Sequence, residues 1–183
     1  MLSATPNLPS RWLKFLSEVD SRLPGQVKIH CVGGFVITLL YGLTRTTADI
    51  DYIEISPANA TQVLQDIAGP GSEVHKRHGL YFQHVGVASI PESYNGRLIE
   101  PFPRYFRRLR LLALEPHDLA LSKLARNSPV DQGDVKYLAE TVPLDREILL
   151  ARYKDELRPI IIGDPNTHDQ TMKMWLEVFF PTH

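Results

Sequence analysis

Residues 27–52, VKIHCVGGFVITLLYGLTRTTADIDY, contain the features that decide the fold. The segment 27–32 is rich in apolar and β-branched residues and runs directly into Gly33 and Gly34, which predicts a strand that ends at a glycine turn. The next residues, FVITLLYGL, predict a short buried helix, and residues 48–55, ADIDYIEI, alternate as strand residues do. This stretch therefore predicts a strand, a glycine turn, a helix and a second strand.

Two aspartates lie two positions apart on the second of these strands. Because successive side chains of a strand point to opposite faces, Asp49 and Asp51 are expected on one face, about 6 to 7 Å apart. At an effective dielectric of about 20, their repulsion is on the order of 2 to 3 kcal/mol. A divalent cation between them would convert this repulsion into binding, and carboxylate oxygens favour a hard ion such as Mg²⁺ or Mn²⁺. Taken singly, such a pair is more often a solvated strand edge, so its neighbours decide the interpretation.

The glycine pair supplies those neighbours. Gly33 and Gly34 let the backbone approach a bulky anion closely and direct free N–H groups towards it. Arg45 and the hydroxyl of Thr47 lie in the loop before the carboxylates, where they can make charge-assisted contacts with phosphates. The sequence therefore predicts that these four residues bind the phosphates of a nucleoside triphosphate (NTP) whose metal ion the aspartates hold.

Two blocks of the chain resemble the nucleotidyltransferase superfamily. Residues 32–52, VGGFVITLLYGLTRTTADIDY, are similar to its signature, an apolar residue and G-[GS] followed by D-h-[DE]-h. The R-x-T before D-I-D resembles the toxin-like branch related to AbiEii nucleotidyltransferases. Residues 114–138, LEPHDLALSKLARNSPVDQGDVKYL, are similar to a helical segment of that branch and match its positions at Asp118, Lys123, Asp131 and Asp134. The resemblance covers residues from about 28 to 140.

This resemblance implies an activity and partners. Asp49 and Asp51 would hold the metal ions, the two glycines would seat the triphosphate, and Lys123 would approach the nucleotide phosphates from the helical half. The implied reaction transfers a nucleoside monophosphate from an NTP to a hydroxyl of an RNA, such as a tRNA, or of a protein, and releases pyrophosphate. A toxin of this kind would also have a separate antitoxin protein as partner.

The chain departs from the superfamily pattern at a third carboxylate, which members normally carry on a later strand. The stretch that aligns best, VGVASIPESY at 85–94, has Ala88 and Ser89 at the expected place. Glu100 is a candidate substitute from a neighbouring strand. The alternative interpretation is therefore a catalytically degenerate module that binds a nucleotide or RNA without turnover.

Composition bounds the architecture. With 183 residues, 43% of them apolar, the chain can bury a core as a single domain. We expect an α/β fold, with a nucleotidyltransferase-like mixed sheet flanked by helices over 25–114 and a helical part over 115–183. The net charge of −1 provides no global field towards nucleic acid or membrane. The sequence shows neither a signal peptide nor an apolar stretch of membrane-spanning length, and its single cysteine, Cys31, suits core packing in a reducing, cytoplasmic location.

Several further expectations concern individual elements. Ser10 is expected to cap a first helix that extends to Leu23, and residues 73–90 are expected to hold one or two strands. Strands are also expected at 97–102 and 109–114, and helices at about 57–68, 115–126, 131–141, 145–156 and 167–179. The basic run from Arg104 to Arg110, interleaved with aromatic residues, predicts either an RNA-binding segment or a salt-bridged surface. Asp118 is expected near a helix start, as a cap or a catalytic group, while Asp131 and Asp134 are expected to cap and orient the next helix.

Overall fold

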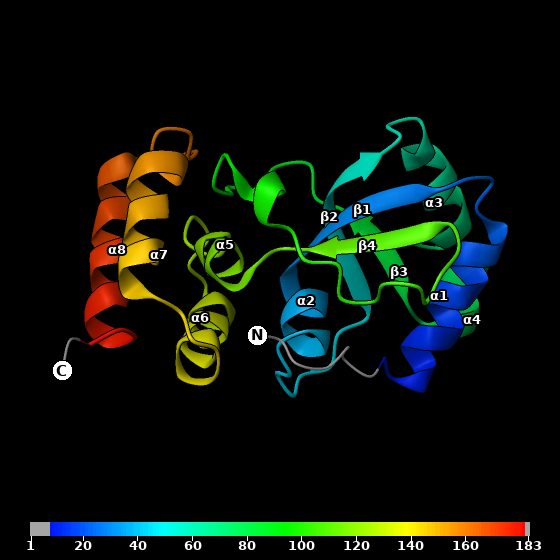
Figure 1. Cartoon of the computed structure of the whole chain (residues 1–183), viewed down its shortest axis with the longest axis horizontal. Coiled ribbons are helices and arrows are strands. Elements are labelled where there is room, and N and C mark those ends of the chain that lie inside the picture. Colours follow the sequence, from blue (N-terminus) through cyan, green and yellow to red (C-terminus); the bar gives the residue numbers. More distant parts are fainter. Residues whose placement is uncertain (1–7, 182–183) are drawn as a thin grey trace. The chain divides into compact units, whose positions relative to one another are not determined.

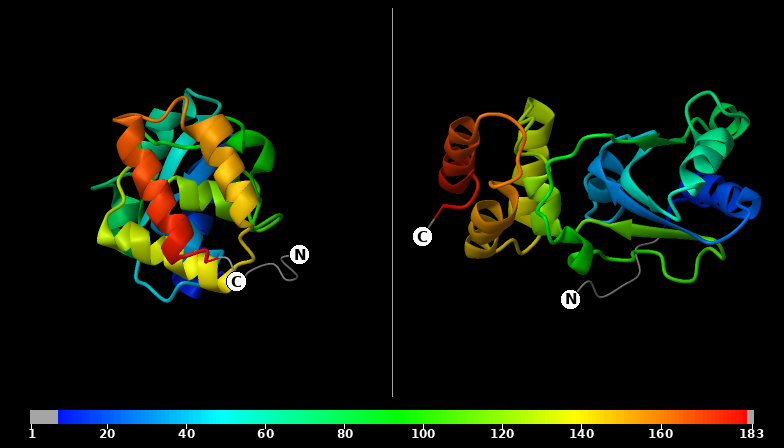
Figure 2. Two further views of the ribbon diagram at one scale, coloured as in Figure 1. Left: turned by 90° about the vertical axis from the view of Figure 1, so that its left-hand side faces the viewer. Right: turned by 90° about the horizontal axis from the view of Figure 1, so that it is seen from above.

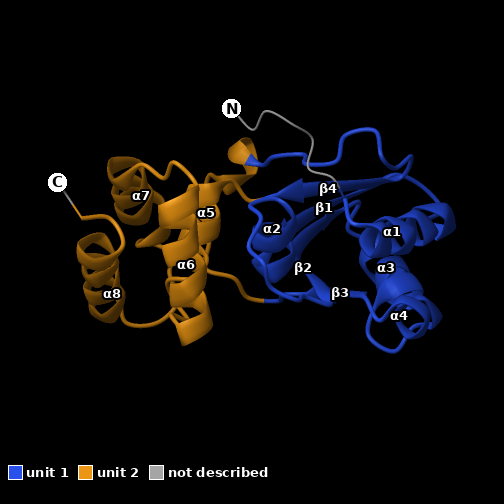
Figure 3. Ribbon diagram, turned by 90° about the horizontal axis from the view of Figure 1, so that it is seen from below, with its two compact units in different colours: residues 1–86, 98–113 blue, residues 87–97, 114–183 orange. Residues whose placement is uncertain are grey.

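The computed structural model describes residues 8–181 and divides them into two compact units (Figure 3). Unit 1 contains the chain up to Gly86 together with residues 98–113. Unit 2 contains residues 87–97 and the chain from Leu114 onwards. Each unit is thus built from two separate stretches of chain.

Unit 1 contains the β-sheet. Its elements, labelled in Figure 1, are α1 (Ser10–Arg22), β1 (Val27–Val32), α2 (Gly33–Leu39), β2 (Asp49–Ser56), α3 (Ala60–Ala68), α4 (Glu73–His78), β3 (Tyr81–His84) and β4 (Leu109–Ala113). The four strands lie in the order β3-β2-β1-β4. β1 is antiparallel to β2 and parallel to β4, and β2 is parallel to β3. The mixed sheet flanked by helices confirms the expected α/β, nucleotidyltransferase-like fold.

The core of unit 1 lies on the face of the sheet that α1, α3 and α4 cover (Figure 1). Phe15 of α1 stacks on Phe82 of β3 with ring centroids 5.7 Å apart, and Phe82 in turn meets Tyr52 of β2 edge to face. The Tyr52 hydroxyl accepts a hydrogen bond of 2.9 Å from the Gln65 amide of α3. Leu64 of α3 is completely buried beside them. The alternation of buried and exposed residues along β2 follows from this one-sided covering.

The structure corrects one expectation at a helix start and adds a helix that was not expected. Ser10 does not cap α1, because it is the first helical residue and Pro9 holds the cap position without a side-chain hydrogen bond. Residues 73–78 form the helix α4, which the sequence did not predict; the Ser72 side chain accepts the N–H of His75 and so provides its N-cap. Gly79 then ends α4 in a left-handed conformation.

Within 73–90 the structure agrees with the expectation of one or two strands, whereas the strand expected at 97–102 is absent. The structure contains β3 within 73–90, and it starts at Tyr81 and ends at His84. Residues 97–102 make no strand; Ile99 forms an isolated bridge with Ala113. That single bridge nevertheless places the segment before β4 alongside this strand.

Unit 2 is helical. Its elements are η1 (Tyr94–Arg97), α5 (Pro116–Leu121), α6 (Pro129–Thr141), α7 (Arg146–Arg152), the π-helical turn η2 (Tyr153–Leu157) and α8 (Pro165–Val178). α7 and α8 lie side by side in two views (Figures 1 and 2). All four α-helices described in unit 2 start at an acidic or serine cap that accepts backbone N–H groups, namely Glu115, Ser128, Asp145 and Asp164. None of the helices in the described part of the chain is long and apolar enough to cross a membrane.

Candidate functional site

Gly33 lies against the carboxylate of Asp51. The register of β1 and β2 pairs Val32 with Asp51, so the turn that follows β1 begins beside that aspartate. Gly33 has a φ of +72°, and a β-carbon added to it would lie 2.5 Å from Asp51 Oδ2. Both the left-handed backbone and the close approach require glycine here. The turn and the aspartate thus form one contiguous surface.

Gly34 faces the loop that precedes β2. A β-carbon added to Gly34 would lie 3.1 Å from an Nη atom of Arg45 and 3.2 Å from the Thr47 hydroxyl oxygen. The Thr47 hydroxyl in turn donates a 3.0 Å hydrogen bond to Asp49 Oδ1. The structure therefore brings together the glycines, the carboxylates, Arg45 and Thr47, the six residues of unit 1 that the sequence singles out.

The donor set at this cluster suits a hard cation and an anion side by side. Asp49 and Asp51 are both half-buried on β2, and two carboxylates beside a threonine hydroxyl offer the oxygen ligands that Mg²⁺ prefers. Arg45 supplies a guanidinium group and the glycine turn supplies backbone that carries no side chain of its own, and both kinds of group can contact phosphate oxygens. The arrangement can therefore accommodate a metal–phosphate pair.

The neighbouring strand β3 adds two polar residues to the same face. Its register pairs Tyr81 with Asp49 and Gln83 with Asp51, and residues paired in this way share a sheet face. Burial, followed by the charges of the two aspartates, raises the pKa of Tyr81 above its ordinary value. Neither residue was singled out from the sequence, because the short strand YFQH could not be separated there from the residues that follow it.

In the described part of the chain, no third carboxylate joins the pair to form a metal-binding group. Ala88 and Ser89, where the sequence alignment places this position, lie outside the strands and belong to unit 2. Glu100, the candidate substitute, forms hydrogen bonds of 2.9 and 2.5 Å with Arg110. Among residues 8–181, no group of three or more His, Cys, Asp and Glu side chains is placed to hold a metal ion.

Cys31 and His30 lie on β1 beside this cluster. Cys31 is completely buried, as expected for core packing, and burial followed by the charge of Asp51 raises the pKa of its thiol far above the ordinary value. His30 lies 3.5 Å from the Glu54 carboxylate, and its burial lowers its pKa despite that neighbour. The thiol is therefore kept protonated and unreactive.

The downstream block of the sequence resemblance belongs to unit 2. Lys123 is 5% exposed, and its Nζ lies 3.0 Å from Asp134 and 3.8 Å from Asp131. Asp131 forms a capping box with Ser128 at the start of α6, which confirms its expected capping role. Asp134 lies inside α6 and does not cap it; its carboxylate pairs with Lys123. The role of Lys123 at a nucleotide stays a prediction.

Asp118 is not a helix cap. It is completely buried, and Glu115 occupies the cap position of α5. Arg97 donates two hydrogen bonds to Asp118, of 2.8 and 3.0 Å, and Arg152 donates another of 3.0 Å. Arg97 also binds Glu156. This network connects η1, α5 and η2 within unit 2.

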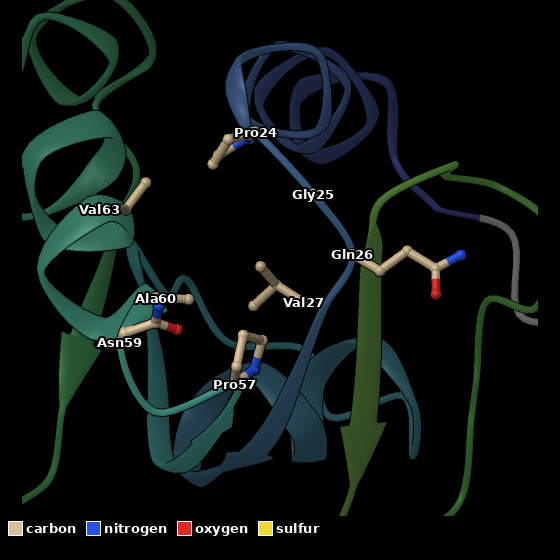
Figure 4. A pocket seen from close by; sticks show the side chains of 8 residues that line it. All are labelled: Pro24, Gly25, Gln26, Val27, Pro57, Asn59, Ala60 and Val63. Carbon is tan, nitrogen blue, oxygen red and sulfur yellow. The ribbon is translucent and has the colours of Figure 1, made fainter.

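A cavity of about 290 Å³ in unit 1 lies away from the acidic pair (Figure 4). Its lining includes Val27, the first residue of β1, and Pro57, which follows the end of β2. Asp51 and Gly33 lie at the opposite end of these two strands. The cavity is lined mainly by apolar groups and does not include any of the predicted site residues.

Comparison with known proteins gives one match. The family described as "Nucleotidyltransferase of unknown function (DUF6036)" matches residues 11–178 of the chain. No curated protein and no solved structure matches.

Proposed function

The chain belongs to a family of nucleotidyltransferases of unknown function, and from this premise we propose that it is a metal-dependent enzyme whose active site is the cluster around Asp49 and Asp51. It would transfer a nucleoside monophosphate from an NTP to a hydroxyl of an RNA or a protein. The observation that carries the proposal is the contact between the glycine turn and the carboxylates, with Gly33 against Asp51 and Gly34 against Arg45 and Thr47.

Each residue would have a defined task. The two aspartates would hold Mg²⁺ or Mn²⁺, which when bound supplies charge neutralisation of the triphosphate and lowers the pKa of an attacking hydroxyl. The turn at Gly33 and Gly34 would let the triphosphate approach the backbone, with Arg45 beside it. Thr47 would hold Asp49 in position through its 3.0 Å hydrogen bond.

The proposed reaction is a simple displacement at phosphorus. The acceptor oxygen forms a bond to the α-phosphorus, and the bond from that phosphorus to the oxygen bridging to the β-phosphate breaks. Pyrophosphate leaves with the bonding electrons, and the acceptor proton passes to solvent. Positioning and charge stabilisation supply most of the catalysis in such a transfer, which is what a rigid turn beside two carboxylates offers.

The direct test is incorporation of label from an α-labelled NTP into the RNA and protein fractions of a cell extract. We expect Mg²⁺-dependent labelling by the wild-type chain and its loss in Asp49→Asn, since the variant keeps the size of the side chain but loses its charge. Asp66→Asn is the matched control, because Asp66 is an exposed aspartate of α3 in the same unit. Undiminished labelling by Asp49→Asn would exclude this site as the active site.

The second candidate function is a module that binds a nucleotide or RNA without catalysis. The observation that favours it is the neutral pair Tyr81 and Gln83 on the strand beside the aspartates, together with the engagement of Glu100 by Arg110. This alternative predicts Mg²⁺-dependent NTP binding, detected by calorimetry, without pyrophosphate release for any acceptor offered. Pyrophosphate release that Asp49→Asn abolishes would rule it out.

The sequence resemblance to the toxin-like branch also supports a proposal about biology, namely that the chain is a toxin held inactive by a separate antitoxin protein. Expression of the wild-type chain alone should then arrest growth, and Asp51→Asn should relieve the arrest at equal protein level. Normal growth with the wild-type chain expressed would count against a toxin role while leaving the transferase proposal intact.

A further inference from the structure

Residues 104–108, RYFRR, precede β4 and form an exposed basic segment of unit 1 that we call the arginine loop. In Figure 1 it is part of the green segment that leads into β4. Its three arginine side chains are exposed. Among the described residues, Arg104 and Arg107 have no hydrogen-bond or ion-pair partner for their guanidinium groups, while Arg108 donates to the carbonyl of Ser21 at 3.0 Å. Two positive charges are therefore left for a ligand.

The arginine loop is held in a fixed conformation. The carboxylate of Asp20, on α1, accepts the backbone N–H groups of Arg107, Arg108 and Leu109 at 3.1, 2.7 and 2.7 Å. The carbonyl of Arg108 accepts the N–H of Val27 at 2.7 Å. Because Asp20 is engaged with the backbone, it anchors the loop without pairing with the Arg104 or Arg107 side chain. A preformed loop loses less entropy when it binds a ligand.

An exposed aromatic ring lies between these arginines. Tyr105 is 42% exposed, and its ring packs against the buried Phe102 at 5.8 Å and against Phe106 at 6.2 Å. The supporting rings fix the orientation of Tyr105 while its outer side remains in solvent. Unpaired arginines beside a supported, exposed aromatic ring are the combination that binds a nucleic acid strand through its phosphates and one base.

The backbone at Arg104 is strained. Arg104 has a φ of +72°, a left-handed conformation that costs a residue with a β-carbon about 1 to 2 kcal/mol relative to the right-handed one. Glycine would adopt this conformation without strain, yet the position carries a long basic side chain. Strain retained where the side chain has no internal partner points to a function for that side chain.

The arginine loop and the carboxylate pair lie at opposite ends of the same strands. The loop joins the start of β4, which pairs with the start of β1 at Val27, whereas Asp51 pairs with Val32 at the end of β1. Five residues of strand separate these ends, or roughly 17 Å. Lys28, exposed and in register with Arg110, lies on the face of β1 that also carries Val32, so a basic group lies between the loop and the acids.

We propose that the arginine loop and Lys28 bind the backbone of a single-stranded RNA end. The terminal hydroxyl of that RNA would be the acceptor at the carboxylate pair, so this inference rests on the proposed transferase function. The guanidinium groups match phosphodiesters, and Tyr105 needs an unstacked base, which a single strand offers and a duplex does not. The separation from the carboxylates requires an end several nucleotides long. A protein acceptor gives no reason for a phosphate-binding loop at this distance, so the surface favours RNA.

The test measures binding apart from catalysis, by fluorescence anisotropy of a labelled single-stranded oligoribonucleotide at several salt concentrations. The double variant Arg104→Gln/Arg107→Gln should bind at least about tenfold more weakly, and the slope of log K against log salt should fall by about 1.4, because two phosphate contacts are lost. Lys14→Gln/Lys76→Gln removes the same charge elsewhere on unit 1 and should leave the slope unchanged. An equal slope in both double variants would overturn the proposal.

Two single variants separate the contacts from the fold. Arg104→Gly should weaken RNA binding while its thermal midpoint stays equal or rises, since glycine relieves the backbone strain. Tyr105→Leu keeps an apolar side chain on Phe102 but removes the stacking ring, so affinity should fall about 5- to 150-fold. Wild-type affinity for RNA in both folded variants would contradict the assignment.

Three further measurements identify the ligand and separate RNA binding from the proposed transferase activity. Asp49→Asn should bind RNA with wild-type affinity although it transfers no label. Equal affinity for a single-stranded DNA, or labelling of protein with no RNA binding, would overturn the RNA assignment. If protein is labelled without RNA binding, loss of that labelling in Asp49→Asn would still support the transferase function. Failure of the RNA proposal can therefore be told apart from failure of the transferase proposal.

Discussion

At the scale of single residues, the site depends on one glycine whose place no other residue can take, a second glycine packed closely on its neighbours, and one hydroxyl group. Gly33 adopts a φ of +72° directly against Asp51, and Gly34 lies against Arg45 and Thr47. The Gly33 backbone lies against the Asp51 carboxylate, and the Thr47 hydroxyl donates a hydrogen bond to the Asp49 carboxylate. These contacts orient the two carboxylates. Small changes at these positions should therefore disturb the carboxylates directly.

The first prediction concerns Gly33→Ala. The added methyl group would lie 2.5 Å from Asp51 Oδ2, so the aspartate side chain must move. The left-handed backbone conformation costs an alanine a further ~1 to 2 kcal/mol. We expect label transfer to be lost and the free energy of unfolding, measured in urea, to fall by about that amount or more. Gly25→Ala is the control, because nothing lies within 4 Å of its added carbon. Equal activity in both variants would contradict the proposed contact.

The second prediction concerns Thr47→Val, which keeps the shape of the side chain and removes the hydroxyl that donates to Asp49. Without that donor the Asp49 carboxylate can turn away from the metal position, so kcat should fall roughly tenfold or more, which is about 1.4 kcal/mol. Water can replace the donor at the half-buried Asp49, so the thermal midpoint should change little. Thr47→Ser, which restores the hydroxyl, should recover most of the rate. If the serine variant is as slow as the valine variant, orientation of Asp49 is not the role of this residue.

The residues of the carboxylate cluster could be predicted from sequence because they lie close together in it. Strand alternation alone places Asp49 and Asp51 on one face, and the glycines follow a strand directly. Tyr81 and Gln83 could not be predicted, since their position beside the aspartates depends on the pairing of β2 with β3. The partners of Asp118, which come from residues 97 and 152, likewise depend on tertiary packing.

At the scale of elements, single polar residues at helix starts decide where several helices begin. Ser72 starts a helix at 73–78 that the sequence did not predict, because one N-cap hydrogen bond satisfies a backbone N–H at its first turn. Long periodic patterns were more dependable: the strand at 27–32 and the helix after residue 10 have the expected extents to within one residue. The segment 97–102 lacked a partner strand and therefore stayed irregular.

The third prediction concerns the start of α6. Burial alone would raise the pKa of Asp131, but hydrogen bonds from Arg126 and Ser128 outweigh it and lower the pKa from 3.8 to about 2. Since the folded-state value is the lower one, the stabilisation is complete above 3.8 and is lost as the pH falls towards 2. Asp131→Asn should lower the free energy of unfolding by about 1 to 2 kcal/mol near neutral pH.

The measurement is the free energy of unfolding in urea, for wild type and Asp131→Asn, at about pH 7 and again at about pH 2.5. The difference between them should shrink at the lower pH, because the wild-type aspartate has begun to lose its charge. Glu140→Gln, at an exposed position of the same helix, serves as control. A difference that stays constant over this range would show that the charge of Asp131 does not stabilise α6.

At the scale of the whole molecule, the chain forms two units and passes between them more than once. Residues 87–97 belong to unit 2 although the stretches on either side belong to unit 1. Arg97 fixes this segment by binding both Asp118 and Glu156. The integrity of unit 2 thus depends on a residue far in sequence from its other helices.

The fourth prediction follows from that dependence. Arg97→Met removes two hydrogen bonds from the completely buried Asp118 carboxylate and leaves it with Arg152. Removing one partner of a buried ion pair costs about 3 to 5 kcal/mol, so the urea midpoint should fall accordingly. Arg158→Met, which breaks an exposed pair with Asp169 in the same unit, should cost much less. Equal losses in the two variants would show that burial of Asp118 adds nothing to the pair.

The central claim, that two carboxylates and a glycine turn together bind a metal–triphosphate pair, is tested most directly by isothermal titration of an NTP into the full chain with and without Mg²⁺. The account predicts that the wild-type chain binds the NTP in the presence of Mg²⁺, and that Asp51→Asn and Gly33→Ala each weaken this binding at least about tenfold, or 1.4 kcal/mol. Binding that needs no Mg²⁺, or that both variants retain in full, would contradict it.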